Sequence, residues 1–403
     1  MSELLSYQQL VAIADEFGTP VYVYHAEKIA EQYARLKTAF ADQDVVLFYA
    51  SKALTNINIL RYINSLGANV DCSSINEVKL ALHAGFVPKN ILYTSNSIAF
   101  SEIEEAKNLG VHINIDSISN LEKFGKKFGN SYAIGIRLRP TILAGGNLKI
   151  STGHDKSKFG IPVDQFDKVL ECINQNNLLI KGLHIHTGSE IGDVGIFVKG
   201  IEKLFDIIPH FKDLEFIDLG GGFKVPYKEG DSETDINLLA QKVKEAFANH
   251  PNPGKKHLQI WFEPGKFLVS AAGYFITQVN VLKETSSTVF AGINTGFNHL
   301  IRPMFYDAYH RIENISNEKG PQKIYTVVGN ICETDTFATD RKINEIKEGD
   351  YLVFYNAGAY GFEMSSNFNS RLKPAEVLVK NGKAVLIRKK DVFEDLLKNQ
   401  IEL

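Results

Sequence analysis

The sequence predicts an α/β protein in which a (β/α)8 TIM barrel is followed by a second, C-terminal all-β domain. Three observations lead to this prediction. Short β-branched and aromatic runs alternate with helix-like segments over the first two thirds of the chain. From about residue 274, similar runs continue without amphipathic helices between them. The length of 403 residues accommodates a barrel of about 250 residues and a smaller partner domain.

Eight strand-like runs are expected to form the barrel. The first four begin 21 to 24 residues apart, a spacing typical of parallel strands joined by helices. Helical periodicity between the runs is clearest at 75–83, 102–109, 166–173 and 196–208. The eight runs are residues 45–50, 69–72, 91–93, 112–115, 133–138, 180–186, 215–219 and 258–262.

The second domain is expected from short strand-like runs and a charged helical tail around residues 392–399. At the other end of the chain, a helix-like stretch covers residues 7–17 and an extended one covers 21–24. Periodicity alone leaves open whether these stretches join the barrel or the β domain. The runs of the second domain are residues 274–281, 324–328, 351–355, 376–379 and 384–387.

Composition narrows the functional classes. The 44 basic and 47 acidic side chains leave a net charge of -3, so no overall basic field attracts nucleic acid or an anionic membrane. The cysteines, Cys72, Cys172 and Cys332, are odd in number and far apart, which predicts neither a disulfide framework nor a zinc site. The start of the chain resembles no secretory signal, and the most apolar stretch, 267–279, is shorter than the roughly 20 residues that cross a bilayer. We therefore expect a cytoplasmic protein.

Residues that follow the strands are the first candidates for chemistry, because barrel enzymes work at the C-terminal ends of their strands. Lys52 follows the first strand, where an amine can form a Schiff base or simply extend into solvent. The seventh strand runs into three glycines, which offer N–H groups to a phosphate or form a flexible turn. These glycines are Gly220, Gly221 and Gly222.

Two more strand ends carry ionisable groups. Glu263 follows the eighth strand and could bind a ring nitrogen and hold its proton, or be a surface acid. His186 could stack on a flat ring, although a lone histidine is more often structural. His184 and His186 could also form a metal pair, since alternate strand residues share a face, but no third ligand is evident and we expect no metal.

Longer motifs resemble those of the fold-type III pyridoxal-phosphate-dependent decarboxylases, and among them most closely the diaminopimelate decarboxylases. The resemblance covers almost the whole chain, and the motifs follow the order that is usual in the family. They lie at residues 157–160 (SKFG), 184–189 (HIHTGS), 220–222 (GGG), 263–265 (EPG), 300–303 (LIRP), 328–335 (VGNICETD), 356–360 (NAGAY) and 365–371 (SSNFNSR).

The resemblance implies that a barrel of residues 26–273 binds pyridoxal 5'-phosphate. It also implies that residues 1–25 complete a β domain of residues 274–403, and that two chains form a head-to-tail homodimer with shared sites. Lys52 then resembles the lysine that forms the aldimine with the cofactor, and Cys332 the proton donor from the other subunit. Thiols are mostly protonated at neutral pH, which suits a donor, whereas a free cysteine is otherwise usually a small buried residue.

The remaining positions are assigned by the same resemblance. His186 would stack on the ring and Glu263 would partner the pyridine nitrogen. The substrate is inferred from Arg302, because a guanidinium binds a carboxylate with two hydrogen bonds. Diaminopimelate has a carboxylate at its unreactive end, whereas ornithine, lysine and arginine do not. The implied reaction is decarboxylation of meso-2,6-diaminopimelate to L-lysine. Further cofactor contacts are Ser189, Gly220, Gly221, Gly222, Gly265, Lys266 and Tyr360, and further substrate contacts are Lys266, Tyr306, Glu333 and Tyr360.

Several positions depart from the family pattern. Lys266 stands where arginine is usual, which replaces a planar fork by a point charge. Glu190 and Thr187 replace the usual glutamine and isoleucine. These departures leave open a related decarboxylase for another basic or D-configured amino acid. An amino-acid racemase and a non-catalytic binding relative fit less well, because Glu263, Lys52 and Cys332 are all present.

Overall fold

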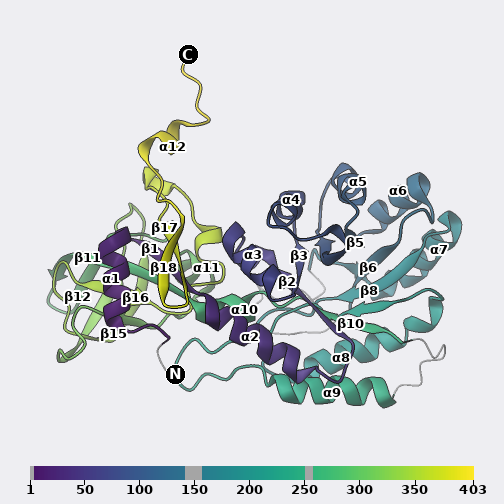
Figure 1. Cartoon of the computed structure of the whole chain (residues 1–403), viewed down its shortest axis with the longest axis horizontal. Helices are drawn as coiled ribbons and strands as arrows, with labels where there is room; N and C mark the ends of the chain where they lie inside the picture. The colour runs from purple at the N-terminus through teal and green to yellow at the C-terminus, as the bar shows by residue number, and fades with distance from the viewer. Residues whose placement is uncertain (1–3, 141–156, 250–256) are drawn as a thin grey trace. The chain divides into compact units, whose positions relative to one another are not determined.

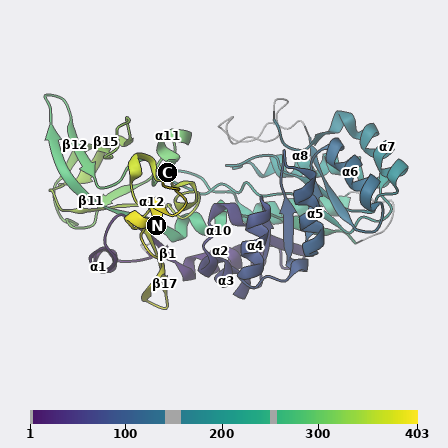
Figure 2. The ribbon, with the colours of Figure 1, turned by 90° about the horizontal axis from the view of Figure 1, so that it is seen from above.

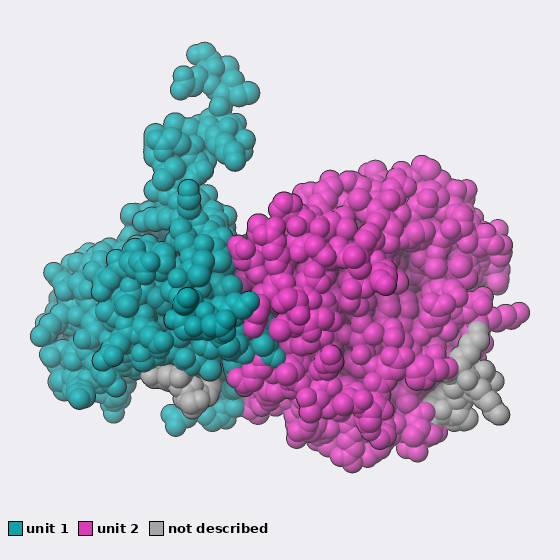
Figure 3. Space-filling model, viewed as in Figure 1, with its two compact units in different colours: residues 1–30, 226–231, 268–403 teal, residues 31–225, 232–267 magenta. Residues whose placement is uncertain are grey.

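The computed structural model describes residues 4–140, 157–249 and 257–403, which form two compact units (Figure 3). Unit 1 contains the described residues up to Ala30, with Pro226–Asp231 and Leu268–Leu403. Unit 2 contains the described residues of Glu31–Val225 and Ser232–Phe267. The domain limits expected from the sequence, 26–273 and 274–403, remain predictions. The expectation that the chain starts without a secretory signal rests partly on residues 1–3, which lie outside the described residues.

Unit 2 holds a closed ring of eight parallel strands, which confirms the predicted barrel. The pairing of β5 with β6 and of β2 with β10 closes the ring. A short strand, β7 (Ile161–Pro162), pairs with β6 outside it. The ring strands are β2 (Val45–Ala50), β3 (Asn69–Cys72), β4 (Ile91–Thr94), β5 (His112–Ile115), β6 (Ile134–Arg139), β8 (Ile180–Ile185), β9 (Phe216–Asp218) and β10 (Gln259–Phe262).

Helices follow the strands and lie outside the ring (Figure 1). Polar side chains start several of them, because the side chains of Asn56, Ser74, Ser117 and Asp193 accept N–H groups of the first turn. Short 3₁₀ turns are η1 (Ser51–Ala53), η2 (Pro88–Asn90), η3 (Val163–Gln165) and η4 (Ile208–His210). The helices are α2 (Ala26–Ala39), α3 (Ile57–Ser65), α4 (Ile75–His83), α5 (Phe100–Leu109), α6 (Ile118–Phe128), α7 (Phe166–Asn176), α8 (Val194–Phe205), α9 (Ile236–Asn249) and α10 (Lys266–Val269).

Unit 1 is built on a second sheet, and the N-terminal strand is part of it. β1 (Val21–His25) lies between β11 (Gly273–Glu284), to which it is antiparallel, and β17 (Ala375–Lys380), to which it is parallel. This pairing confirms that N-terminal residues complete the C-terminal β domain. The other strands are β12 (Val289–Ile293), β13 (Ile312–Asn314), β14 (Gln322–Val328), β15 (Thr336–Asn344), β16 (Tyr351–Phe354) and β18 (Lys383–Arg388).

One helix covers this sheet and shorter ones connect its strands. α1 (Tyr7–Phe17) starts with a capping box formed by Ser6 and Gln9, and its buried residues join the core of β1, β16 and β17. β11 and β12 run side by side in a long antiparallel pair (Figure 2). Within the described ranges, no helix has both the length and the apolar character that a membrane span requires. The remaining elements are α11 (Arg302–Tyr306), α12 (Phe393–Leu397), η5 (Ser270–Ala272), η6 (Phe362–Met364) and η7 (Phe368–Ser370).

Candidate active site

The barrel residues singled out from the sequence gather at one end of the ring. Parallel strands that close into a barrel all end on the same side, so residues at their C-terminal ends face a common space. Lys52 follows β2 and lies in η1, His184 and His186 lie at the end of β8, and Glu263 follows β10. The structure adds Asp71, Arg137 and Asp218, at or near the C-terminal ends of β3, β6 and β9, which the sequence analysis did not select.

The amine of Lys52 is held by a buried carboxylate. Its Nζ lies 2.9 Å from Oδ2 of Asp71, and the Lys52 side chain is 40% exposed whereas that of Asp71 is 1% exposed. The hydroxyl of the neighbouring Ser51 donates hydrogen bonds to the backbone oxygen of Asp71 and to Oε2 of Glu77. A reactive amine is therefore kept accessible while its counter-ion is shielded from water.

Three further buried groups form a polar cluster beside this pair. One nitrogen of His184 and one carboxyl oxygen each of Asp218 and Glu263 lie within 4.8 Å of one another. His184 Nε2 is 3.6 Å from Glu263 Oε1. In the part of the chain that the structure describes, Asp218 Oδ2, Glu263 Oε1 and both His184 nitrogens have no hydrogen-bond partner of ordinary geometry. Buried polar atoms of this kind point to a missing ligand.

Burial sets the protonation of the cluster. It raises the pKa of Glu263 well above its ordinary value, and the negative charge of Asp218 adds to this effect. Burial also raises the pKa of Asp218, to about 7, and lowers that of His184 well below its ordinary value. His184 is therefore neutral near pH 7, and the two carboxyl groups tend to retain a proton. The sequence suggested His184 and His186 as a possible metal pair, but the structure groups His184 with Asp218 and Glu263 instead.

Arg137 brings a second cation to the cluster. It is buried in β6, and its guanidinium lies over the ring of Phe159, 4.9 Å from the ring centre. Its positive charge helps burial to lower the pKa of both His184 and His186. The contact gives the motif at residues 157–160 a role, since Phe159 supports an arginine of the site.

His186 and the glycine turn after β9 are tied together by hydrogen bonds. The N–H of Gly221 donates to Nδ1 of His186 (3.2 Å), and the N–H of Gly220 donates to Oδ1 of Asp218 (2.9 Å). Burial lowers the pKa of His186 to about 3, so its imidazole ring is uncharged at neutral pH. Two of the three N–H groups that we expected to face a phosphate are therefore used inside the barrel.

The glycines are also required by close packing. A Cβ on Gly221 would lie 2.2 Å from the backbone oxygen of Glu263, and one on Gly222 would lie 2.1 Å from that of Gly188. Gly222 has a φ of +98°, which side chains rarely tolerate. The turn therefore brings the ends of β8, β9 and β10 closer together than side chains would permit.

Lys266 occurs in an ion pair that the sequence did not reveal. Its Nζ contacts Oε1 of Glu190, and both side chains are mostly buried. Glu190 has a φ of +62°, which is uncommon for a residue with a side chain. The two departures from the family pattern are thus in contact, and the charge of Lys266 is compensated. Ser189 and Gly265 are the neighbours of these two residues in the chain.

The remaining candidate residues lie in unit 1. Arg302 and Tyr306 are one helical turn apart on α11, and Arg302 Nη1 donates to the backbone oxygen of Ala359, 3.2 Å away. Tyr306 donates its hydroxyl hydrogen to the sulfur of Met364 (3.9 Å). Tyr360 follows Ala359 and has a φ of +56°. The unit therefore brings the residues expected to hold the substrate to neighbouring positions.

Cys332 and Glu333 lie in the loop between β14 and β15, and both are exposed. Asn369 fixes the cysteine at two points. Its Oδ1 accepts the N–H of Cys332 (2.9 Å), and its Nδ2 lies 3.1 Å from the sulfur and donates to it. The motif at residues 365–371 therefore orients the thiol, a role that could not be inferred from the sequence alone.

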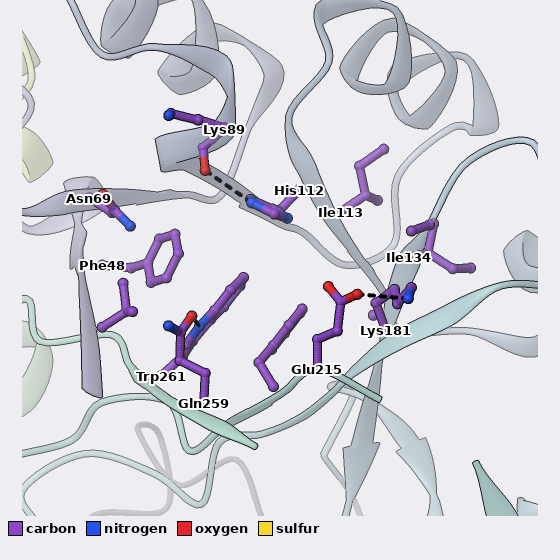
Figure 4. Close-up of a pocket in the computed structure, with 14 residues that line it drawn as sticks. Phe48, Asn69, Lys89, His112, Ile113, Ile134, Lys181, Glu215, Gln259 and Trp261 are labelled. Atoms are coloured by element: carbon purple, nitrogen blue, oxygen red, sulfur yellow. Dashed lines mark hydrogen bonds and ion pairs between the residues drawn. The ribbon is translucent and has the colours of Figure 1, made fainter. Parts of the chain in front are cut away.

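A pocket also exists at the opposite end of the barrel (Figure 4). Two polar pairs lie within it: Lys181 pairs with Glu215 (2.7 Å), and a ring nitrogen of His112 hydrogen-bonds to the backbone oxygen of Lys89 (3.0 Å). None of the site residues expected from the sequence lines it. The lining residues are Val46, Phe48, Asn69, Lys89, His112, Ile113, Ala133, Ile134, Gly135, Lys181, Glu215, Phe216, Gln259 and Trp261.

The C-terminal end of the barrel fits the cofactor that the sequence led us to expect. The accessible amine of Lys52 suits the aldehyde of the cofactor, and the unpartnered buried oxygen of Glu263 suits its ring nitrogen. The neutral imidazole of His186 suits the face of the ring. The glycine turn holds the backbone of the neighbouring strand ends close beside them. No residue of the group conflicts with such a ligand.

Comparison with known proteins supports the same assignment. A family model described as "Pyridoxal-dependent decarboxylase, pyridoxal binding domain" matches residues 26–270. The chain is 39% identical to the diaminopimelate decarboxylase of Methanothermobacter thermautotrophicus, over 98% of this chain and 95% of that one. It is 36% identical to the diaminopimelate decarboxylase of Escherichia coli K12, over 98% and 96% of the two chains.

Solved structures agree. Diaminopimelate decarboxylase from Helicobacter pylori, complexed with L-lysine, is 32% identical and superposes with a TM-score of 0.89 over 98% of both chains. A lysine/ornithine decarboxylase from Vibrio vulnificus is 22% identical, with a TM-score of 0.82 over 94% of this chain and 98% of that one, and shows a shared fold. The comparisons confirm the resemblance that was inferred from the motifs.

Proposed function

Because the chain belongs to the pyridoxal-dependent decarboxylase family, we propose that it converts meso-2,6-diaminopimelate to L-lysine and carbon dioxide. It is a carboxy-lyase, and its cofactor is pyridoxal 5'-phosphate. The curated relatives that support the substrate are diaminopimelate decarboxylases, which match this chain over nearly its whole length. The Helicobacter pylori relative was solved with L-lysine, the product of this reaction.

Arg302 is the observation that carries the substrate assignment. Arg302 is 4% exposed, and it forms no ion pair with a carboxylate among the described residues. One nitrogen donates to Ala359, the guanidinium lies 5.0 Å from the ring centre of Tyr227, and Nε has no partner among the described residues. A buried guanidinium without a counter-ion is unfavourable, so this position favours a ligand that brings a carboxylate. Diaminopimelate brings one at its unreactive end.

The barrel residues divide the work of cofactor binding. When bound, pyridoxal phosphate supplies an aldehyde that captures the substrate amine and a ring that takes up the electrons left by carbon dioxide. The amine of Lys52 would hold the cofactor through its aldehyde, and Asp71 keeps that amine in place. Glu263 holds a proton at the ring nitrogen, and His186 offers its neutral face to the ring. The phosphate would be bound by Ser189, the N–H of Gly222 and Tyr360, because the N–H groups of Gly220 and Gly221 already donate to Asp218 and His186. Gly265 and Lys266 would border the cofactor.

A proton must then be returned to the α-carbon, and we assign this step to Cys332. The enzyme would act as a homodimer in which the partner subunit's Cys332 reaches the site, with Glu333 and Tyr306 contacting the substrate. Two features support an assembly of this kind. The thiol is exposed yet held by Asn369. The C-terminal tail exposes apolar side chains, including Val392 (54%), Phe393 (62%) and Leu397 (45%), which a partner surface would cover.

We also place the enzyme in the cytoplasm, with small amino acids as its ligands and without a nucleic-acid or membrane partner. The nearly balanced charge of 44 basic and 47 acidic side chains supports this placement.

A substrate panel tests the proposed reaction. Purified holoenzyme should release carbon dioxide from meso-diaminopimelate and at least ~100-fold less efficiently from ornithine, lysine or arginine, because these leave Arg302 unpaired. Arg302→Gln should lower kcat/KM for diaminopimelate by ~30-fold or more. Arg341→Gln, a change of another unit 1 arginine, is the control. Faster release from ornithine, lysine or a D-amino acid would overturn the substrate assignment in favour of the related decarboxylases.

The role of Cys332 is tested separately. Cys332→Ala should reduce kcat by ~10²-fold or more while cofactor stays bound, since the thiol acts only on the proton transfer. Cys172→Ala, in α7, is the matched control and should retain activity. Mixed Lys52→Ala and Cys332→Ala dimers should recover part of the activity, since one site of each heterodimer is intact. No recovery despite demonstrated subunit exchange would exclude a donor from the partner.

A further inference from the structure

We propose that Tyr227 is a positioning residue that holds the guanidinium of Arg302 by its face, which leaves the N–H edge free for the carboxylate at the unreactive end of the substrate. The inference rests on the proposed function, because that function gives Arg302 its carboxylate-binding role. It adds a residue that the sequence motifs did not single out, since Tyr227 lies in the connection between β9 and α9.

Tyr227 and Arg302 are in contact inside unit 1. Both are buried, with 9% and 4% of their surfaces exposed. The central carbon of the guanidinium lies over the tyrosine ring, 5.0 Å from the ring centre. An aromatic ring attracts a cation over its face, and the attraction is stronger where water is excluded. The ring therefore offsets part of the cost of burying the charge of Arg302.

The hydrogen-bonding edge of Arg302 is not used by this contact. The N–H groups of a guanidinium lie in its plane, so a ring on the face engages none of them. Nη1 donates to the backbone oxygen of Ala359 (3.2 Å), and Nε has no partner among the described residues. A carboxylate of the protein in place of the ring would bind this edge and compete with the ligand. An aromatic partner fixes the arginine without that competition.

The ring of Tyr227 is itself held by two neighbours. Its hydroxyl lies 3.2 Å from the hydroxyl of the fully buried Ser270, with which it forms a hydrogen bond. The imidazole of His310 contacts the ring edge-to-face, with the ring centres 5.7 Å apart. All three residues belong to unit 1. The orientation of the ring is therefore fixed by the unit that carries Arg302.

The backbone contact of Arg302 is fixed from the same place. The backbone oxygen of Ser270 accepts the N–H of Gly358 (3.3 Å), in the turn that presents Ala359. Nδ2 of Asn356, in the same turn, donates to the backbone oxygen of Pro226 (2.9 Å), next to the tyrosine. The aromatic ring and the carbonyl oxygen that contact the guanidinium are therefore held relative to each other.

Two ligands that differ by one carboxylate measure the effect without turnover. L-Lysine, bound as the product, retains the carboxylate from the unreactive end of diaminopimelate, and 1,5-diaminopentane lacks it. Calorimetry with the holoenzyme gives the affinity for each. In Tyr227→Leu, L-lysine should bind ~5- to 30-fold more weakly and 1,5-diaminopentane should change by less than ~2-fold, because only L-lysine uses Arg302. Tyr309→Leu removes a ring that contacts Arg341 in the same unit (3.7 Å), and this matched control should change neither affinity.

Substitutions that keep the shape of the ring separate attraction from packing. Tyr227→Phe should retain the affinity for L-lysine within ~3-fold, because the ring face is preserved. A trifluorinated phenylalanine at this position has nearly the same shape but an electron-poor ring face, so it should lose affinity as Tyr227→Leu does. A ring with a purely structural role would not distinguish the two. This comparison also decides the proposal if Tyr227→Leu does not fold.

A double-mutant cycle tests whether Tyr227 acts through Arg302. Arg302→Gln alone should weaken L-lysine binding, and adding Tyr227→Leu should weaken it by less than ~2-fold more. Additive losses, or equal affinities of the phenylalanine and trifluorinated variants, would overturn the role of Tyr227 and leave the substrate assignment standing. If Arg302→Gln still prefers L-lysine to 1,5-diaminopentane as strongly as the parent does, the substrate assignment fails together with this inference.

Discussion

The two ends of the barrel are built from the same eight strands but treat polar groups in opposite ways. At the C-terminal ends, buried atoms of His184, Asp218 and Glu263 have no partner of ordinary geometry within the described residues. At the N-terminal ends, several polar groups around the pocket pair with each other, as Lys181 does with Glu215 (2.7 Å) and Trp261 Nε1 with Gln259 (2.6 Å). One end leaves polar groups for a ligand, whereas the other satisfies its own.

Packing differs in the same sense. At the N-terminal ends, the rings of Phe216 and Trp261 are stacked with centres 3.5 Å apart, and Phe48 packs on Trp261 at 4.4 Å. At the C-terminal ends, backbone packs on backbone instead, since a Cβ on Gly221 would lie 2.2 Å from the backbone oxygen of Glu263. We infer that the N-terminal end contributes stability and the C-terminal end gives up stability for function, a division common in barrel enzymes.

The largest contrast is expected from two lysines, each paired with a carboxylate at one end. Lys52→Ala should reduce kcat by ~10³-fold or more, because the amine that holds the cofactor is lost. Lys181→Ala should leave kcat unchanged and lower the free energy of unfolding by ~0–1 kcal/mol, since its partner Glu215 is largely exposed. Decarboxylation rates and urea unfolding of both variants measure the contrast. Comparable rate losses in the two variants would contradict the division.

The next largest effect is expected on the free energy of unfolding, from a substitution at the N-terminal end of the barrel. Trp261→Ala removes a buried ring from the cluster with Phe48, Leu92 and Phe216, and should lower the free energy of unfolding by ~3–5 kcal/mol. Trp261→Phe keeps a stacked ring and should cost clearly less. With cofactor saturating and the protein folded, kcat should stay within ~3-fold of the parent value. A large loss of kcat at unchanged stability would show that the N-terminal end takes part in catalysis.

How much of the structure could be predicted from the sequence depends on whether each feature is determined by neighbouring residues or by residues far apart in the chain. All eight barrel strands were predicted within one or two residues of their ends, because alternation and βα spacing are local patterns. In unit 1, β12, β13 and β15 were missed. β13 has only three residues, and β15 mixes charged and apolar positions without a clear period.

The active-site prediction was limited in a similar way. Residues after strands, such as Lys52 and Glu263, were found because strand ends are visible in the sequence. Asp71, Arg137 and Asp218 lie within strands rather than after them, and the sequence analysis did not select them. Charged residues are rarely buried without a partner, so a charged residue within a strand-like run was a usable signal of a functional site. Its meaning depends on which strands are neighbours around the ring, and that information is not local. The roles of all these residues remain predictions until variants are measured.

The smallest expected effect concerns Lys266 and Glu190, which are 76 positions apart and whose contact could not be foreseen. Glu190→Gln removes the carboxylate that compensates Lys266, so the positive charge beside this position increases. KM for diaminopimelate should fall by ~2- to 10-fold at low salt, with kcat little changed, and the effect should shrink as salt screens the charge. Glu215→Gln, which frees Lys181 at the N-terminal end, should leave KM unchanged. If both variants shift KM equally, the effect is one of net charge. If KM rises in Glu190→Gln alone, the ion pair itself holds Lys266 in the position that binds substrate. Glu190 would then contribute to binding at the C-terminal end by orienting Lys266 as well as by its charge.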